Sequence, residues 1–433
     1  MKRFFADQKD NYCLCFDSVT LKWIIGEKKL SLSCSNDDRF LIEIFESEDT
    51  EDNRLENLTN NLSENNFIGM SILPTFECNL KCLHCFYESG PNKHFVALDE
   101  KYIPLIIDFV NENNIENITI GGGEPLIWRH LRKFLEEVLE KTNARIFLLT
   151  NGLMINLIED LLRSSRFNVQ ISVDAARRET YKRIRGGDFE KLMKNIVKLK
   201  EIGVDVALSY TIHSYNKAEV VDFIKKAELV EVNSIHFPII ERYGRAKSND
   251  IIPDSKKLTD LYQFLIYYSF HYNKIKIYFV EEIKLRLLRR ITRHNCSALY
   301  NQLSLASDGY FYPCSELIND RFKICHISEY KNLKEIIKKF KTRTGIGTPV
   351  VEKICPECPI KLLCGGGCRA VELLSGKSFV EAKAESLVCD IFIKSVFTIL
   401  WELANYELNP PVPIDLLYSK EVLRLVEKYE KQS

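Results

Sequence analysis

Three cysteines lie close together in residues 78–85, which read Cys-Asn-Leu-Lys-Cys-Leu-His-Cys and follow an apolar run at 72–74. A structural zinc site takes four tetrahedral ligands, and the nearby His84 adjoins Cys85, so both could hardly reach one metal. Three thiolates suit a four-iron four-sulfur cluster that keeps one iron free of protein ligands, where a chelating small molecule can bind. The alternative is a loop whose thiols bind nothing. The spacing favours an iron-sulfur site on Cys78, Cys82 and Cys85.

A second group of cysteines occupies the C-terminal third of the chain. Its members are Cys296, Cys314, Cys355, Cys358, Cys364, Cys368 and Cys389. Four of them fall within residues 355–368, which is denser than packing alone explains, and Gly365 to Gly367 suit tight wrapping of the backbone between ligands. Cysteines clustered in this way on a large chain favour metal binding over disulfides, with a zinc ribbon as the alternative to iron-sulfur clusters.

A glycine-rich segment could bind a small polar ligand. Residues 121–125 read Gly-Gly-Gly-Glu-Pro and follow a strand expected at 117–120. Glycines let a ligand approach the backbone closely, and the Glu124 carboxylate suits an ammonium group. A simple turn is the alternative. Ser172 and Arg185 add a hydroxyl and a guanidinium fork, which suit a carboxylate, although a local cap or a surface ion pair would use the same residues.

Alternating strand and helix patterns surround these residues and must position them. We expect strands at 115–120, 145–149, 168–173, 204–212 and 234–239, and helices at 98–113, 129–141, 189–200 and 217–229. Repeated strand-helix pairs predict an α/β fold with a parallel sheet covered by helices and functional groups at the carboxyl ends of the strands. Thr211 and His213 would then face the same end of the sheet as Glu124, in roles that the sequence does not determine.

The first cysteine triplet and the Gly-Gly-Glu sequence together resemble the signature of the radical S-adenosylmethionine (SAM) enzymes. The resemblance implies a partial (β/α)6 TIM-like barrel, a cluster on the triplet, and SAM bound at the open iron through its amino and carboxylate groups. Cleavage of SAM would give methionine and a 5′-deoxyadenosyl radical that abstracts hydrogen from a substrate. The residues that the resemblance assigns to this cofactor are His84, Gly122, Gly123, Glu124, Ser172, Arg185 and Thr211.

The C-terminal cysteines resemble the SPASM extension of these enzymes, which carries two auxiliary four-iron four-sulfur clusters. Carried over by position, Cys355, Cys358, Cys364 and Cys389 would hold an outer cluster, and Cys296, Cys314 and Cys368 an inner one. Members with a full inner set have a further cysteine soon after the first, and residues 297–313 contain none. Cys325 is the remaining candidate, but we favour an open inner iron that takes up a substrate thiolate or amide.

Composition and patterning limit the kinds of partner that the protein can have. The 433 residues are 45% apolar and carry no net charge, which leaves no electrostatic footprint for nucleic acid or an anionic membrane. Without an N-terminal leader or a long apolar span, the chain is expected to be cytoplasmic. We expect domains at 1–68, 69–288 and 289–395, followed by a helical tail at 396–433.

The first of these domains is expected to be a small α+β element. Strands at 12–16 and 21–33 and helices at 39–46 and 52–62 resemble the winged-helix-like element that holds leader peptides in ribosomal peptide-modification pathways. A decorative N-terminal extension is the alternative.

The family resemblance predicts a peptide-modifying enzyme. A ribosomally made precursor peptide with a leader would receive a thioether or carbon-carbon crosslink, and an electron donor such as flavodoxin or ferredoxin would reduce the enzyme. Formylglycine formation of the sulfatase-maturase type, or peptide epimerisation, is the alternative; such maturases place an aspartate after the second SPASM cysteine, where this chain has Ser315 and then Glu316. A non-catalytic metal scaffold would leave Glu124, Ser172 and Arg185 without a ligand.

Overall fold

The computed structural model describes residues 4–9, 11–27, 68–91, 96–292, 296–406, 408 and 411–432. Its main body is built on a nine-stranded sheet in the order β10-β9-β8-β7-β6-β5-β4-β11-β12. The strands are β4 Gly69–Thr75, β5 Asn117–Gly122, β6 Arg145–Thr150, β7 Phe167–Ser172, β8 Asp205–Ser209, β9 Ser234–His236, β10 Lys276–Ile277, β11 Gln302–Ala306 and β12 Phe311–Tyr312. Neighbouring strands are parallel except β11 and β12. The predicted α/β fold with a parallel sheet is confirmed.

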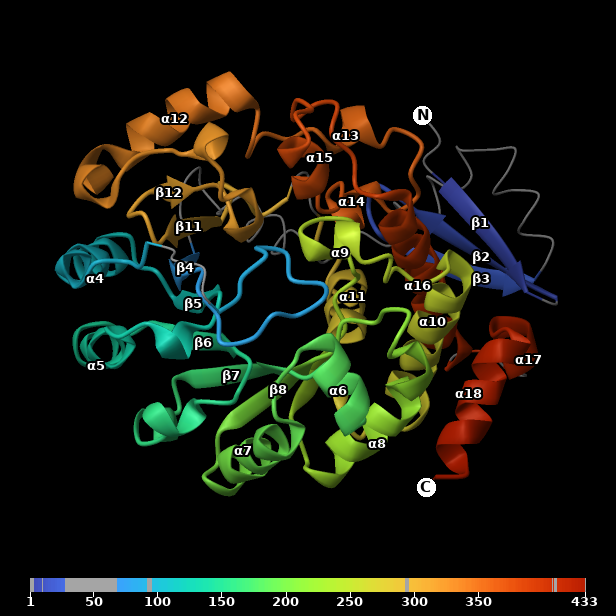
Figure 1. The fold of residues 1–433 in the computed structure, drawn as a ribbon. Helices are drawn as coiled ribbons and strands as arrows, with labels where there is room; N and C mark the ends of the chain where they lie inside the picture. Colours follow the sequence, from blue (N-terminus) through green and yellow to red (C-terminus); the bar gives the residue numbers. More distant parts are fainter. Residues whose placement is uncertain are drawn as a thin grey trace.

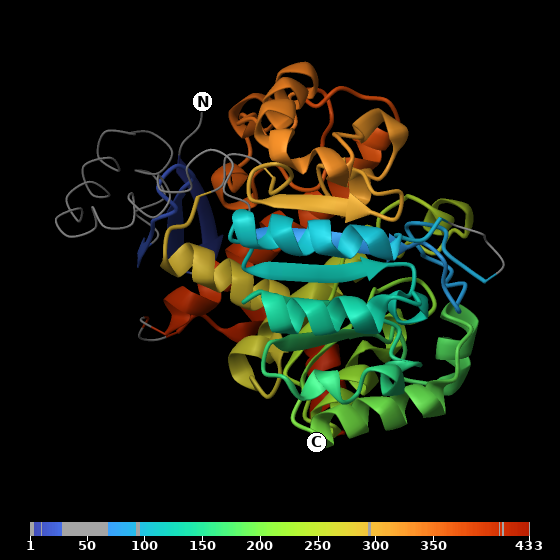
Figure 2. The same cartoon turned by 90° about the vertical axis from the view of Figure 1, so that its left-hand side faces the viewer.

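Helices connect the strands and cover the outside of the curved sheet (Figure 1). The helices of the core are α4 Ile103–Glu112, α5 Leu131–Lys141, α6 Arg178–Ile184, α7 Phe189–Glu201, α8 Val220–Leu229, α9 Arg245–Ser248, α10 Ser255–His271 and α11 Tyr278–Leu288. The short α9 lies beside the cysteine loop and not on the outside, and its Arg245 N–H donates to the Cys85 carbonyl at 3.1 Å. In α4, Ile103, Ile106, Ile107 and Val110 are buried, the spacing that turns one face of a helix to the sheet. The parallel strands point the same way, so their carboxyl ends share one edge, where the loop after β4 lies (Figure 2).

Three local differences from the expected elements have physical reasons. The strand expected at 204–212 ends at Ser209, and the Thr211 backbone N–H instead donates to the Asp174 side chain at 2.6 Å. Helix α6 is not predicted, because its seven residues bury only Tyr181 and Ile184 and so show too short an apolar pattern. Helix α10 is not predicted, because it is buried on almost all sides and so shows no apolar stripe.

The cysteine-rich segment shares the sheet of the core. Strand β11 pairs with β4 in parallel, from Gln302 opposite Gly69 to Ala306 opposite Leu73. Its helices are α12 Leu333–Thr344, α13 Val351–Ile354, α14 Lys361–Cys364, α15 Ala370–Leu374 and α16 Ser386–Asn405, and the tail forms α17 Ile414–Leu417 and α18 Lys420–Glu430. The boundary expected near residue 288 therefore divides a continuous sheet.

The described N-terminal residues form a three-stranded antiparallel sheet, β1 Phe4–Lys9, β2 Tyr12–Asp17 and β3 Trp23–Glu27. This sheet lies beside α16 (Figure 1), where Trp401 donates its indole N–H to Asp7 at 2.8 Å and Phe16 meets Phe397 edge to face at 6.1 Å. The helices expected at 39–46 and 52–62 lie outside the described residues. In the part of the chain that is described, no helix is long and apolar enough to cross a membrane.

Candidate functional site

A cavity of about 280 Å³ opens at the carboxyl ends of the parallel strands. It is lined by all three cysteines of the first triplet and by each residue that we assign to the SAM cofactor, namely His84, Gly122, Gly123, Glu124, Ser172, Arg185 and Thr211. Segments far apart in the sequence therefore contribute to one site, as the parallel sheet predicts.

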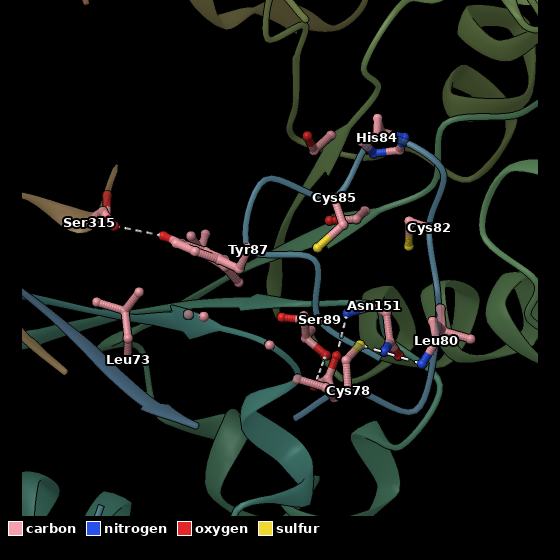
Figure 3. A pocket seen from close by; sticks show the side chains of 18 of the residues that line it. Leu73, Cys78, Leu80, Cys82, His84, Cys85, Tyr87, Ser89, Asn151 and Ser315 are labelled. Carbon is pink, nitrogen blue, oxygen red and sulfur yellow. Dashed lines mark hydrogen bonds between the residues drawn. The ribbon is translucent and has the colours of Figure 1, made fainter. Parts of the chain in front are cut away.

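The cysteine triplet lies in the loop after β4, and Figure 3 shows the sulfurs of Cys78, Cys82 and Cys85 turned toward the same space. Burial raises the pKa of Cys78 to about 12, although the Leu80 N–H, which donates to its sulfur at 3.4 Å, lowers it. Burial also raises the pKa of Cys82. Buried thiols ionise when a metal group stabilises their thiolates, so this donor set fits an iron-sulfur cluster. Among the described residues, no three His, Cys, Asp or Glu side chains form a site for a single metal ion.

The glycine segment is packed against the start of the cysteine loop. Gly123 donates its N–H to the Thr75 carbonyl and Glu124 to the Glu77 carbonyl, both at 2.9 Å. A Cβ on Gly123 would lie 2.0 Å from the Glu77 oxygen, and Gly122 has a φ of +103°. These glycines thus let the chain's own backbone approach closely, and this contact fixes the path of the cysteine loop.

This contact predicts a large difference between two neighbouring substitutions. Gly123→Ala is expected to destabilise the fold by more than about 3 kcal/mol and to lower the iron bound at the first triplet, because backbone must move. Gly121→Ala is the matched control, since its Cβ would lie no closer than 3.4 Å to the flexible Leu149 side chain. Thermal unfolding and iron analysis compare the two proteins. Equal stability of both variants would contradict the steric argument.

Glu124 is fully buried at the end of β5 and is held by three donors. Its carboxylate accepts from the Thr150 hydroxyl at 2.7 Å, the Asn151 N–H at 2.8 Å and the Leu126 N–H at 3.1 Å. Burial raises the pKa of Glu124, while the donated hydrogen bonds lower it. Glu124 therefore joins β5 to β6 beneath the cavity, and its contact with a bound ammonium group stays a prediction.

Asp174, just after β7, organises the polar side of the cavity. Its carboxylate forms a buried ion pair with Arg185 and lies 3.3 Å from Nε2 of His84. The Thr211 N–H also donates to this carboxylate. The φ of Asp174 is +56°, which is rare for a residue with a side chain. Burial alone would raise the pKa of Asp174, but Arg185 and then His84 hold it well below its usual range. Asp174 follows the strand expected at 168–173, and the sequence analysis assigns it no role.

Several buried polar atoms at this cavity have no partner among the described residues. They are Nδ1 of His84, Oγ of Ser89 and Nε of Arg185. Unsatisfied buried donors and acceptors are costly, so their presence around one cavity fits a polar ligand such as SAM. Ser89 was not predicted. His213 lies behind His84, with ring centroids 5.7 Å apart, and burial lowers its pKa to about 4.

A second cavity, of about 640 Å³, is lined by all seven C-terminal cysteines that we assign to metal. After burial, the largest influences that raise the pKa of Cys364, to about 12, are the other three outer thiols. For Cys314, the largest influences that raise the pKa after burial are Glu316 and the two other inner thiols. The thiols that influence Cys364 and Cys314 are thus the ones grouped with each by position, and the division into an outer set of four and an inner set of three ligands stays a prediction.

Cys325 does not line this cavity. It is 5% exposed within the hydrophobic core, and burial followed by Glu329 raises its pKa to about 12. Glu316, by contrast, lines both cavities, so the two lie next to each other.

The family comparison agrees with this architecture. Residues 72–227 match the model of the radical SAM superfamily. A probable GTP 3′,8-cyclase of Methanococcus vannielii is 26% identical over 63% of this chain and 91% of its own length. The antilisterial bacteriocin subtilosin biosynthesis protein AlbA of Bacillus subtilis is 25% identical over 72% of this chain and 71% of its own.

Solved structures share the fold at low sequence identity. Streptococcus suis SuiB bound to S-adenosylmethionine matches with a TM-score of 0.61 and 16% identity, covering 89% of this chain and 99% of that one. The structure of anSMEcpe with bound AdoMet matches with a TM-score of 0.63 and 20% identity, covering 84% of this chain and 99% of that one. The matched family model, the fold and the cysteine-lined cavity together identify residues 72–227 as the radical SAM domain of an enzyme.

Proposed function

We propose that this enzyme forms a crosslink in a ribosomally made precursor peptide, with a thioether as the favoured bond. The observation that carries the proposal is the second, seven-cysteine cavity beside the first, with Glu316 in the wall of both. Two names among the similar proteins support a peptide substrate: AlbA acts in subtilosin biosynthesis, and SuiB has been solved bound to the precursor peptide SuiA.

The residues divide into three functional groups. Cys78, Cys82 and Cys85 would hold the cluster that superfamily members use with SAM, and the chemistry supplied there is reductive cleavage of SAM to a hydrogen-abstracting radical. Asp174 orients Arg185 and His84 at the cavity wall, where Arg185 presents an unpartnered Nε. The seven C-terminal cysteines would hold two auxiliary four-iron four-sulfur clusters.

A thioether fits the chemistry of these sites. Joining a cysteine sulfur to a carbon removes one hydrogen atom from the carbon, and the 5′-deoxyadenosyl radical takes up this atom to become 5′-deoxyadenosine. It also removes one proton and one electron from the thiol. A metal group with a free coordination position lowers a bound thiol's pKa and supplies a place for that electron. The inner set has three cysteines where the outer has four, which supports a free position for a peptide thiolate.

The position of Cys325 makes the open inner site testable. Cys325→Ala is expected to leave both the iron content and the product unchanged, because this thiol is in the core and away from the cavity. The measurement is iron per chain after anaerobic reconstitution, together with product yield. Loss of about four irons on this single change would make Cys325 the fourth ligand and close the site.

The experiment that tests the function uses the peptide encoded by a short reading frame beside the gene. Incubation with SAM and a strong reductant without oxygen is expected to remove two hydrogens from the peptide and to block alkylation of a cysteine. Loss of the cysteine sulfur would instead indicate formylglycine formation. Solvent deuterium at an α-carbon without a mass loss would indicate epimerisation. Turnover of GTP but not peptide would favour the reaction named for the methanogen relatives.

Leader binding is proposed for the N-terminal segment, on the strength of its antiparallel sheet. The sheet packs on α16 through Trp401, so deleting it would expose apolar surface, and hydrogen exchange on the intact chain is the cleaner measurement. Addition of the leader alone should slow amide exchange in residues 4–27. Protection only at the two cavities would show that the leader binds elsewhere.

A further inference from the structure

The loop that carries the first cysteine triplet is also held by the segment between β9 and α10, which lies far along the chain. Three of the donors that this segment supplies belong to Arg245, the first residue of α9. Its backbone N–H donates to the Cys85 carbonyl at 3.1 Å. Its guanidinium donates from Nε to the Cys82 carbonyl at 2.6 Å and from Nη2 to the Ser89 carbonyl at 2.7 Å. One side chain therefore joins the two ends of the stretch 82–89.

The backbone of this segment lies directly against the cysteine loop. A Cβ on Gly244, the residue before Arg245, would overlap the carbonyl oxygens of Cys85 and Phe86. Beside this contact, the Tyr243 ring packs on the Phe86 ring, with centroids 4.6 Å apart. Contact this close fixes the distance between the segment and the loop, because neither backbone can move toward the other.

The segment is itself anchored, so it can hold the loop in place. Three of its apolar side chains form a small buried cluster, Ile240, Ala246 and Ile251. Leu83 of the cysteine loop packs against this cluster, and its carbonyl accepts from the Asn249 side-chain amide at 2.7 Å. In addition, the Arg242 N–H donates to the Glu385 carboxylate, just before α16, at 3.2 Å. The segment thus connects the cysteine loop to the helix that contains Cys389.

The stretch that Arg245 joins contains much of the predicted SAM site. Cys82 and Cys85 are two of the three predicted cluster ligands, and all of them line the first cavity. His84 and Ser89 each have a buried polar atom without a described partner. Arg245 lines the same cavity. A guanidinium holds its donors in one plane, so two carbonyls that share it are fixed relative to each other. In a catalytic site, a displacement of about 1 Å can lower the rate about 100-fold.

We propose that Arg245 is a positioning residue for SAM cleavage, whose guanidinium holds Cys82 and Ser89 in the arrangement that SAM binding requires. Two hydrogen bonds are far weaker than the bonds of three thiolates to a metal group, so the bound iron should not depend on Arg245. The inference rests on the SAM site of the proposed function and is independent of the peptide and of the bond that is formed.

The test compares Arg245→Gln with the wild type, both as full-length, anaerobically reconstituted enzymes. Without SAM, amide hydrogen exchange in residues 82–89 should become about tenfold faster in the variant, because the two ends of this stretch are no longer joined. Iron content should be unchanged. The kcat of SAM cleavage without peptide should fall about 100-fold, with a smaller change in KM for SAM. Arg245→Lys keeps the charge but loses the fork, and should show the same changes to a smaller degree.

Arg166→Gln provides the control. The Arg166 guanidinium also donates to two carbonyls, those of Thr142 at 2.6 Å and Ala144 at 3.3 Å. These contacts lie at the amino end of β7, away from the cavity. This variant should lose thermal stability, yet keep wild-type exchange in residues 82–89 and wild-type SAM cleavage.

Wild-type SAM cleavage in Arg245→Gln would overturn the inference. So would full activity of Arg245→Lys, since the charge alone would then suffice, or an equal loss of SAM cleavage in Arg166→Gln. Loss of about a third of the iron from Arg245→Gln would also contradict it, because Arg245 would then be needed to hold the cluster itself. A wild-type enzyme that binds no iron at the first triplet would instead overturn the proposed function.

Discussion

Simultaneous replacement of Cys78, Cys82 and Cys85 by alanine is expected to abolish SAM cleavage and to remove about a third of the iron from the reconstituted enzyme. The three sulfurs face one cavity whose wall contains every residue that we assign to SAM, so no other described group is placed to take over their role. The remaining iron should stay with the C-terminal cysteines. Iron analysis and anaerobic detection of 5′-deoxyadenosine provide the measurement.

Cys13→Ala is a suitable control for this experiment. Cys13 is also a buried thiol, but it lies in β2 of the N-terminal sheet and away from both cavities. This variant should retain its iron and its SAM cleavage. Zinc in place of iron in the wild-type protein, or cleavage that survives the triple replacement, would refute the assignment of the first site.

Asp174→Asn is expected to lower SAM cleavage about 100-fold, because Arg185 and His84 lose the charge that orients them at the cavity. Removing one partner of a buried ion pair also leaves the other charge uncompensated, so the free energy of unfolding should fall by about 3 to 5 kcal/mol. Chemical denaturation and a SAM-binding titration separate the two effects. Iron content should be unchanged, since no cysteine is altered.

The control for this change is Asp160→Asn. Asp160 also pairs with an arginine, Arg132, with an oxygen–nitrogen distance of 2.7 Å, but on the surface of the same domain. Because exposed pairs contribute little, thermal unfolding and SAM cleavage should be almost unchanged. An equal loss of thermal stability and of SAM cleavage in both variants would show that the effect does not depend on the burial of Asp174.

The pH dependence of Asp174 follows from the direction of its pKa. The folded-state value is lowered by Arg185 and His84, so the stabilisation is fully present above the unfolded value of about 3.9. It is lost only as the pH falls through the lower, folded-state value. The stability difference between wild type and Asp174→Asn should therefore be constant near neutral pH and shrink in acid.

The sequence predicted the site where spacing alone carries chemical meaning. Both cysteine sets and the glycine-glutamate segment could be located because thiol spacing and small residues are local features of the chain. Asp174 could not, because its importance depends on which groups the fold brings beside it. Ser89 was missed for the same reason, since a single serine in a loop has no distinguishing pattern.

The same limit applies to the fold. Alternating strands and helices were predictable from periodicity, whereas α10 was not, because burial on nearly all sides removes the periodicity. The pairing of β11 with β4 was also not predicted. A short apolar strand has no sequence feature that identifies its partner strand, and here β4 and β11 lie far apart in the sequence.

That pairing has a consequence for how the protein is made. During synthesis, β4 emerges early and can pair with β5 on one side, but its other edge stays open until Gln302 to Ala306 leave the ribosome. An open strand edge is prone to pair with other chains, and contacts between residues this distant form slowly. We therefore expect chains that stop before residue 306 to aggregate, and chaperones to engage the nascent protein until β11 is in place.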